Sequence, residues 1–87
     1  MYYVYVLFGK SDNKFYIGFT EDLRARFKKH QEKGNYTTKR FGELELVYYE
    51  ACKNEADALV REKQLKTGFG RGYLRNRIQK YLASNNN

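Results

Sequence analysis

The chain of 87 residues contains no proline or tryptophan and only one cysteine and one histidine. Without proline there is no proline-stiffened linker, and a chain of this length predicts one domain. The lone Cys52 excludes an intramolecular disulfide framework and a zinc site built from several cysteines, and it is compatible with a reducing compartment. The simplest interpretation of Cys52 is a small apolar residue at the end of a strand.

Long hydrophobic runs are also missing. The most apolar segment, residues 2–8, is far too short to cross a bilayer, and no basic region precedes it as in a signal peptide. We therefore expect a soluble, cytoplasmic protein without a membrane partner. Aromatic residues make up 17% of the chain and supply the area for a modest core.

Acidic residues are scarce toward the C-terminus of a chain whose formal net charge is +7. After Asp57 the only acid is Glu62, which lies among lysines and arginines. A positive potential of this kind favours a polyanionic partner, most simply nucleic acid, and it does not distinguish DNA from RNA. A lone carboxylate in such a field is either a functional group or an ion-pair partner of Lys66, four residues further along a helix.

Three segments have the residue types of β-strands. Residues 2–8 are β-branched and aromatic throughout, and residues 14–19 form a second such run after the turn-rich segment 9–13, so the two predict a β-hairpin. Residues 44–52 alternate enough for a third strand. Gly18, inside the second strand, indicates either a β-bulge or the close approach of a ligand to the backbone.

The first helix is predicted between the second and third strands. Thr20 is its expected N-cap, and Glu21 and Asp22 then occupy a first turn in which negative charge is favourable. The helix is expected to end near Lys33, before an irregular loop over residues 34–43.

Two further helices are expected after the third strand. Asn54 caps the first of them, and its positions 58, 62 and 65 share one face. The glycine-rich segment 67–72 interrupts the helical pattern, and apolar residues at positions 74, 78 and 82 then form the stripe of the last helix. The order β-β-α-β-α-α predicts an α+β fold, with helices flanking a three-stranded sheet. This single domain spans residues 1–83, and residues 84–87 form a polar, disordered tail.

Several side chains suit the cleavage of a phosphodiester, which requires an activated water, stabilisation of charge on phosphorus and a neutralised leaving group. Glu62 can hold one Mg²⁺ or Mn²⁺ ion together with water and substrate oxygens, and Arg26 matches phosphate oxygens. Tyr5 acts as a base only if nearby cations lower its pKa, whereas Tyr16 can orient the water or donate to a phosphate. His30 can shuttle a proton, or hold a phosphate or a tyrosine oxygen.

Each of these residues also has an ordinary structural interpretation. Tyr5 and Tyr16 can be strand tyrosines packed for area, and Arg26 can be a solvated helix charge. His30 can be a helix-surface residue, and Glu62 can be an ion-pair partner. Residue types and spacing alone therefore reach no further than a basic α+β domain with nucleic acid as its candidate partner.

The order of the tyrosines resembles the GIY-YIG nuclease superfamily, in particular its small stand-alone bacterial members. Tyr3-Val4-Tyr5 is similar to the first motif of that family, with Tyr3 in place of its glycine. Tyr16-Ile17-Gly18 matches the second motif literally. The resemblance covers residues 2–82, which is nearly the whole chain.

The two later helices resemble the same family. Residues 22–30 are similar to the helix that carries the family arginine, at Arg26, and the histidine of the small members, at His30. Residues 58–66 are similar to the segment with the metal-binding glutamate, at Glu62.

The resemblance implies a three-stranded antiparallel sheet flanked by helices, and metal-dependent hydrolysis of DNA with a single Mg²⁺ or Mn²⁺ ion, as in repair or recombination. It places Tyr5 or Tyr16 near the attacking water, Arg26 on the scissile phosphate and Glu62 on the metal. The resemblance is to the core domain alone, without an appended DNA-recognition module. Weak sequence specificity, selection of DNA structure or a protein partner for targeting is therefore expected.

Two other functions fit the same sequence. A non-catalytic module with this fold would bind nucleic acid through its positive charge and through the helix that carries Arg71, Arg75 and Arg77. The candidate contacts for either function are Arg24, Lys66, Arg71 and Arg75. A protein-interaction domain would use the exposed edge of the sheet. A metal requirement for turnover indicates the enzyme, whereas salt-sensitive binding without metal or turnover indicates the module. None of these functions calls for a small-molecule cofactor.

Overall fold

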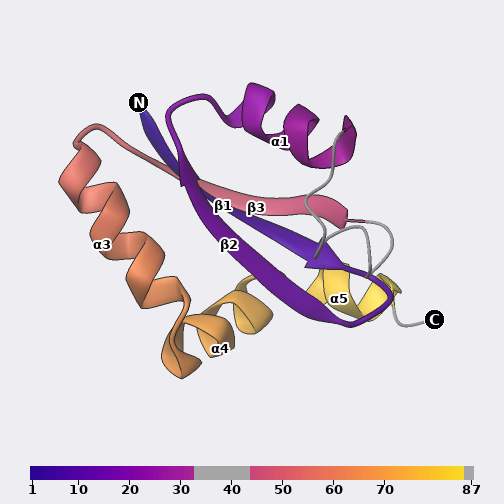
Figure 1. The fold of residues 1–87 in the computed structure, drawn as a ribbon. Coiled ribbons are helices and arrows are strands. Elements are labelled where there is room, and N and C mark those ends of the chain that lie inside the picture. Colours follow the sequence, from indigo (N-terminus) through magenta and orange to yellow (C-terminus); the bar gives the residue numbers. More distant parts are fainter. Residues whose placement is uncertain (33–43, 86–87) are drawn as a thin grey trace.

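The computed structural model describes the backbone of residues 1–32 and 44–85, and the side chains of residues 1–28 and 44–84. Its elements in chain order are β1 (Tyr2–Gly9), β2 (Lys14–Thr20), α1 (Leu23–Glu32), β3 (Leu44–Cys52), α3 (Glu55–Leu65), α4 (Gly68–Arg77) and α5 (Gln79–Asn85) (Figure 1). The predicted α+β fold is confirmed, and the third strand has the predicted bounds. The predicted loop over residues 34–43 lies outside the described residues.

The central strand β1 pairs with both of its neighbours in an antiparallel sheet of strand order β2-β1-β3. The pairing of β1 with β2 is regular over residues 3–9 of β1. A register shift in the pairing with β3 falls between Val6 and Leu7. A bulge at Gly18 is therefore wrong, because within the described strands the irregularity belongs to the other pair.

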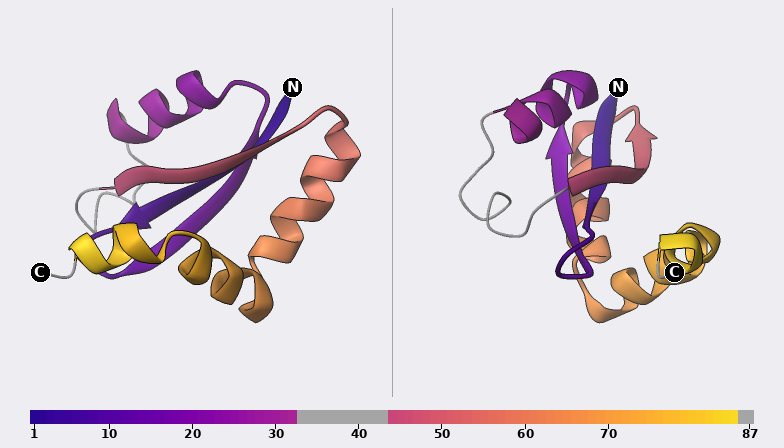
Figure 2. Two further views of the ribbon diagram at one scale, coloured as in Figure 1. Left: turned by 180° about the vertical axis from the view of Figure 1, so that it is seen from behind. Right: turned by 90° about the vertical axis from the view of Figure 1, so that its right-hand side faces the viewer.

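The two faces of the sheet have different partners because alternate strand residues point to opposite sides. Figure 2 shows α1 on one side of the sheet and α4 and α5 on the other. The buried core lies on the second side, where α3 and α4 pack, and comprises Val4, Val6, Phe8, Phe15, Ala58, Leu65 and Leu74. Cys52, at the end of β3, packs against this core as a free thiol, as expected.

The N-cap of α1 is Asp22, so the prediction of Thr20 is wrong. The Asp22 carboxylate accepts a hydrogen bond from the N–H of Ala25 at 3.1 Å, and its carbonyl accepts the first helical bond, from Arg26, at 3.0 Å. The Thr20 hydroxyl instead accepts from the N–H of Asp22 at 3.1 Å. Both residues are good caps, and the one whose oxygen reaches the third helical N–H determines where the helix begins.

Helices α3 and α4 are separated only by residues 66–67, so most of the predicted break over residues 67–72 belongs instead to the start of α4. Thr67 is the N-cap, and its hydroxyl accepts a hydrogen bond from the N–H of Gly70 at 3.1 Å. A Cβ at Gly70 would overlap the backbone of Gln64 and Leu65 at the end of α3. A glycine here therefore allows α4 to start directly against α3, a tertiary requirement that a sequence pattern does not show.

The predicted last helix is divided into α4 and α5 at Ile78, whose φ and ψ are −117° and 33°. Helix α5 extends to Asn85, two residues into the predicted tail. None of the helices in the described part of the chain is long and apolar enough to span a bilayer.

Candidate active site

Tyr5, Gly18 and Arg26 meet on the α1 side of the sheet. Tyr5 in β1 lies directly opposite Gly18 in β2. The Tyr5 ring crosses this position, since a Cβ on Gly18 would overlap the hydroxyl and ring carbons of Tyr5. The Tyr5 hydroxyl accepts a hydrogen bond from Nε of Arg26 at 3.2 Å. The close approach that Gly18 permits is therefore that of a tyrosine from the neighbouring strand.

Arg26 contacts Tyr5 through one of its three guanidinium nitrogens. Arg26 is exposed on α1, and its Nε is the atom that holds Tyr5. Its two Nη groups form no hydrogen bond or ion pair with any residue that the structure describes. Paired Nη donors match two oxygens of one phosphate, so they suit an anionic ligand.

Tyr16 lies on the same face, and its hydroxyl donates a hydrogen bond to the Asp12 carboxylate at 2.5 Å. Burial of Tyr16, together with this hydrogen bond and the negative charge of Asp12, raises the pKa of Tyr16 to about 12. At neutral pH Tyr16 is therefore a hydrogen-bond donor and a poor base.

The Asp12 carboxylate was not found from the sequence. It lies in the turn between β1 and β2, and its second oxygen, Oδ1, is buried without a hydrogen-bond partner among the described residues. A Cβ on Gly9 would overlap this oxygen, so Gly9 provides the room for it. The signal available in the sequence was an acid four residues before the tyrosine of the second motif.

Glu62 comes from α3, on the core side of the sheet. It lies between the buried residues Ala58 and Leu65 of the same helix face, and its side chain is 18% exposed. Its carboxylate forms an ion pair with Lys66 at 3.1 Å. Within the described residues, Glu62 has no direct bond to Tyr5 or Arg26. The structure thus brings Tyr5 and Arg26 into contact, whereas Glu62 lies on α3, on the other side of the sheet.

His30 belongs to α1, one turn after Arg26. Its side chain lies outside the described residues, so its predicted role remains a prediction.

A family model described as the GIY-YIG catalytic domain matches residues 1–76. The chain belongs to the GIY-YIG family. A UPF0213 protein of Limosilactobacillus reuteri is 41% identical over 68 residues, which cover 75% of this chain and 70% of that protein. UPF0213 protein SERP0126 of Staphylococcus epidermidis is 40% identical over 58 residues, which cover 66% of this chain and 71% of that protein.

The resemblance to small bacterial GIY-YIG proteins is thereby confirmed. A UPF0213 protein of Staphylococcus aureus is also similar, at 38% identity over 58 residues, 66% of this chain and 71% of that protein. No solved structure gives a significant match. The GIY-YIG domain is a nuclease-type domain, and GIY-YIG nucleases generally use divalent metal ions.

Glu62 is the candidate carboxylate of this GIY-YIG domain for a divalent cation. Three or more histidine, cysteine, aspartate or glutamate side chains do not cluster anywhere in the described part of the chain. Mg²⁺ commonly uses one or two protein carboxylates and fills its other positions with water and substrate phosphate oxygens. Glu62 can be such a ligand, although the Lys66 ammonium competes with a cation for its oxygens.

The candidate nucleic-acid contacts of the GIY-YIG domain fall into two groups. Arg24, Lys66 and Arg71 are exposed on α1, at the end of α3 and on α4. Arg75 is held against the hairpin, because its guanidinium lies 5.2 Å from the Phe15 ring centroid and Nη2 donates to the Asn13 carbonyl at 3.4 Å.

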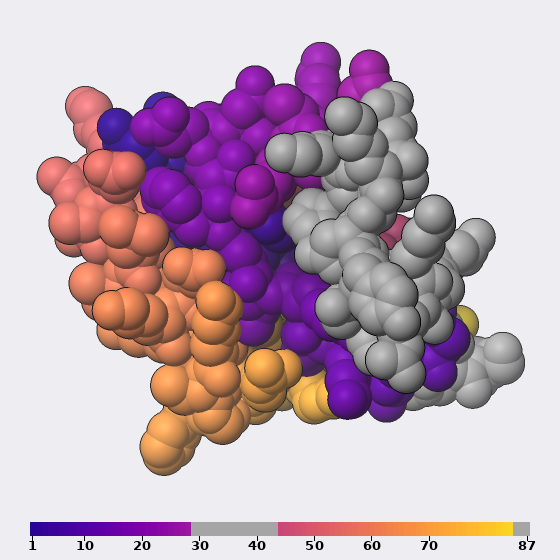
Figure 3. Space-filling view, in the orientation of Figure 1, coloured from indigo at the N-terminus to yellow at the C-terminus, as the bar shows by residue number. Residues whose placement is uncertain are grey.

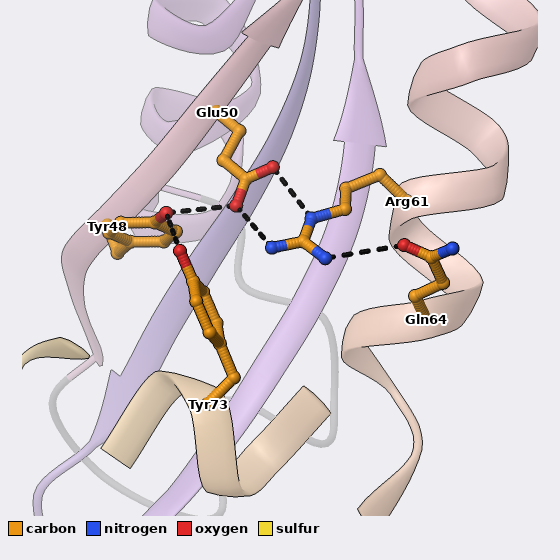
Figure 4. Close-up of polar contacts among 5 residues, drawn as sticks. All are labelled: Tyr48, Glu50, Arg61, Gln64 and Tyr73. Atoms are coloured by element: carbon orange, nitrogen blue, oxygen red, sulfur yellow. Dashed lines mark hydrogen bonds and ion pairs between the residues drawn. The ribbon is translucent and has the colours of Figure 1, made fainter. Parts of the chain in front are cut away.

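A second polar cluster joins β3, α3 and α4 on the core side of the sheet (Figure 4). Arg61 donates from Nε and Nη2 to the two Glu50 oxygens at 2.8 and 2.9 Å, and Tyr48 donates to the same carboxylate at 2.9 Å. The Arg61 guanidinium also lies over the Tyr73 ring, 5.0 Å from its centroid. Arg61 immediately precedes the candidate metal ligand, so these bonds fix the orientation of that part of α3.

Hydrogen bonds from Arg61 and then Tyr48 lower the pKa of Glu50 against the opposing effect of burial. The same hydrogen bond raises the pKa of Arg61. The charged form of each partner is therefore the one that the fold stabilises.

Proposed function

We propose that this GIY-YIG domain is a metal-dependent endonuclease that hydrolyses DNA phosphodiester bonds. It acts with weak sequence specificity or with selectivity for DNA structure, as in repair or recombination. The observation that carries this proposal is the contact of Arg26 with Tyr5 above Gly18. It puts a phenol oxygen and a phosphate-binding guanidinium side by side, which are the two groups needed next to an attacking water and a scissile phosphate.

The two tyrosines have different parts in this proposal. Tyr5 lies in direct contact with Arg26, the proposed phosphate ligand, and this position makes Tyr5 the candidate for accepting a proton from the attacking water. Tyr16 keeps its proton, because its pKa is raised to about 12, and it acts as a donor. This division assigns the base role that the sequence leaves open between them.

Glu62 is the proposed ligand of the divalent cation, Mg²⁺ or Mn²⁺. When bound, the cation supplies Lewis-acid polarisation of the phosphate. The protein contributes one carboxylate, held at 18% exposure on the inner side of α3, and that side is oriented by Arg61 and Glu50.

DNA is the proposed partner, with RNA as the alternative that the charge does not separate. The exposed cations Arg24, Lys66 and Arg71 supply sequence-independent phosphate contacts. A targeting protein partner is compatible with the small size of the domain.

Cleavage of labelled single-stranded, flap, nicked and four-way-junction DNA with Mg²⁺ or Mn²⁺ tests the proposal. Arg26→Ala and Glu62→Ala should each reduce the rate by on the order of 100-fold or more while the fold is retained. Lys28→Ala is the matched control, because it removes an exposed cation from the same helix that is neither in the proposed site nor among the candidate DNA contacts. Normal cleavage by both site variants would contradict the proposed site. Salt-sensitive binding without cleavage by any of the proteins would indicate the binding module.

A further inference from the structure

Phe69 is 96% exposed, more than any other large hydrophobic residue in the described part of the chain. Full burial of such a side chain contributes about 1.5–3 kcal/mol to the free energy of unfolding, and the exposed Phe69 ring does not make this contribution. Phe69 belongs to the first turn of α4. The orange start of this helix projects from the lower left of the molecule in Figure 3.

Two glycines near Phe69, Gly68 and Gly72, face open space in the described part of the chain. A Cβ at Gly68 or at Gly72 would meet no atom within 4 Å, and neither residue has a positive φ. Glycine inside a helix costs about 0.5–1 kcal/mol relative to alanine, and packing against the described residues gives no reason for that cost at either position. Gly68 precedes Phe69 and Gly72 lies three residues after it on the same helix face, so the aromatic ring stays accessible.

The surroundings of Phe69 are positively charged. Lys66, whose side chain is 51% exposed, and Arg71 lie within three residues of it, and the sequence has no acid after Glu62. Arg71 makes no hydrogen bond or ion pair with any residue that the structure describes. An exposed flat apolar ring, with the unpaired Arg71 and the half-exposed Lys66 of the Glu62 ion pair close to it in the chain, complements a ligand that has both planar rings and phosphates, which is a nucleic acid.

We propose that Phe69 stacks on an unpaired base of DNA while Arg71 and Lys66 contact the neighbouring phosphates. The bases inside a duplex are covered on both faces by their neighbours, so a protruding ring finds a stacking partner only at a single-stranded segment, a flap or a junction. This inference rests on the proposed function for its choice of DNA. It narrows the substrate class to DNA with unpaired bases.

Binding measured in EDTA tests the inference separately from cleavage. The probes are a short single strand containing 2-aminopurine, whose fluorescence is quenched by stacking, and the same strand fully paired in a duplex. The proteins are the wild type, Phe69→Ala, Phe69→Trp and Arg71→Ala. Val60→Ala is the matched control, because Val60 is an exposed apolar residue of α3, at 55%.

Phe69→Ala should weaken single-strand binding about tenfold and remove the quenching, while duplex binding changes less than about twofold. Phe69→Trp should keep both the affinity and the quenching, and Val60→Ala should match the wild type. Arg71→Ala should weaken both complexes alike and reduce the salt slope of log affinity by about one.

Equal losses on both DNAs for Phe69→Ala, or no loss on the single strand, would overturn the inference. The absence of wild-type binding to either DNA would overturn it too, as would a concentration-dependent dimer that only Phe69→Ala abolishes. If the wild type stacks on the single strand but never cleaves DNA, the inference stands and the proposed nuclease function is wrong. If the wild type cleaves DNA with metal but Phe69→Ala binds as tightly as the wild type, the nuclease function stands and the inference is wrong.

Discussion

The ring of Tyr5 occupies the space in which any side chain at Gly18 would lie. The two residues are directly opposite in neighbouring strands, and each belongs to one of the two tyrosine-containing motifs. The two motifs are therefore parts of one contact, in which the second strand makes room for the phenol of the first. That room also allows the phenol to reach Arg26 on α1.

Gly18→Ala should displace the Tyr5 ring and break its hydrogen bond with Arg26. We expect a loss of about 1–3 kcal/mol in the free energy of unfolding, as for other overpacked sites, together with a loss of cleavage. Urea denaturation and a cleavage assay on the same preparation measure both effects. Gly72→Ala is the control for stability, because its Cβ enters open space and should stabilise the helix by about 0.5–1 kcal/mol. Equal stability of the two variants would contradict this account of Gly18.

Gly70→Ala and Gly68→Ala should have opposite effects on stability although they lie two residues apart in the first turn of α4. A Cβ at Gly70 would overlap the backbone at the end of α3, which cannot yield easily, so we expect a loss of about 1–3 kcal/mol. A Cβ at Gly68 meets nothing and should be neutral or stabilising. Thermal denaturation of the two variants checks the prediction, and a change of the same sign in both would refute the described packing of α4 on α3.

Tyr16 should titrate near pH 12, above ordinary tyrosines. The difference in absorbance at about 295 nm between the wild type and Tyr16→Phe isolates its ionisation from that of the other tyrosines. Asp12→Asn should lower the pKa because it removes a negative charge, but only in part, since burial is the largest cause of the shift. Identical titration curves for the wild type and Asp12→Asn would exclude the contact between Tyr16 and Asp12.

The sign of the linked stability change follows from the same pKa. The pKa in the folded protein lies above the ordinary tyrosine value of 10.0, so the contribution of Tyr16 to stability is complete below pH 10 and is lost as the pH rises through about 12. Tyr16→Phe should therefore be less sensitive than the wild type to alkaline unfolding in that range.

Arg61→Ala should reduce the free energy of unfolding by about 1–3 kcal/mol, because it leaves the partly buried Glu50 carboxylate without its main donor. Lys66→Ala is the control, since it removes the half-exposed partner of an i,i+4 ion pair and should cost less than about 0.5 kcal/mol. Urea denaturation at neutral pH measures both.

The effect of Arg61→Ala should shrink in acid. The pKa of Glu50 is lowered in the fold by Arg61, so the stability that this pair contributes is present above the usual glutamate pKa and is lost as the pH falls below it. A difference between the wild type and Arg61→Ala that is as large at low pH as at neutral pH would contradict an ionic origin.

The three strands were predictable because their runs of β-branched and aromatic residues determine them. The position of Tyr5 opposite Gly18 was not, because the register between the two strands appears only in the structure. The start of α1 was missed because Thr20 and Asp22 are both good caps, and local preference does not decide between them. Residues 67–72 suggested a break because glycine weakens a helix in isolation, whereas the packing of Gly70 on α3 appears only in three dimensions.

The sequence proposed the candidate residues one by one, and it did not predict which of them are in contact. Tyr5 and Arg26 are 21 residues apart, and their hydrogen bond depends on α1 folding back over the sheet. Asp12 was missed because its role comes from a turn that brings it to Tyr16. Phe69 was missed because exposure of an aromatic side chain has no signature in the sequence.

The most direct test of the central claim is a double-mutant cycle on Tyr5 and Arg26, measured as single-turnover cleavage of a labelled flap DNA with Mg²⁺. The account predicts that the wild type cuts and that Tyr5→Phe and Arg26→Ala each slow cleavage strongly. The double variant should be little slower than Arg26→Ala alone, because the two residues act as one unit. Losses that simply multiply, or variants that cut as fast as the wild type, would contradict the claim that this contact forms the centre of the nuclease site.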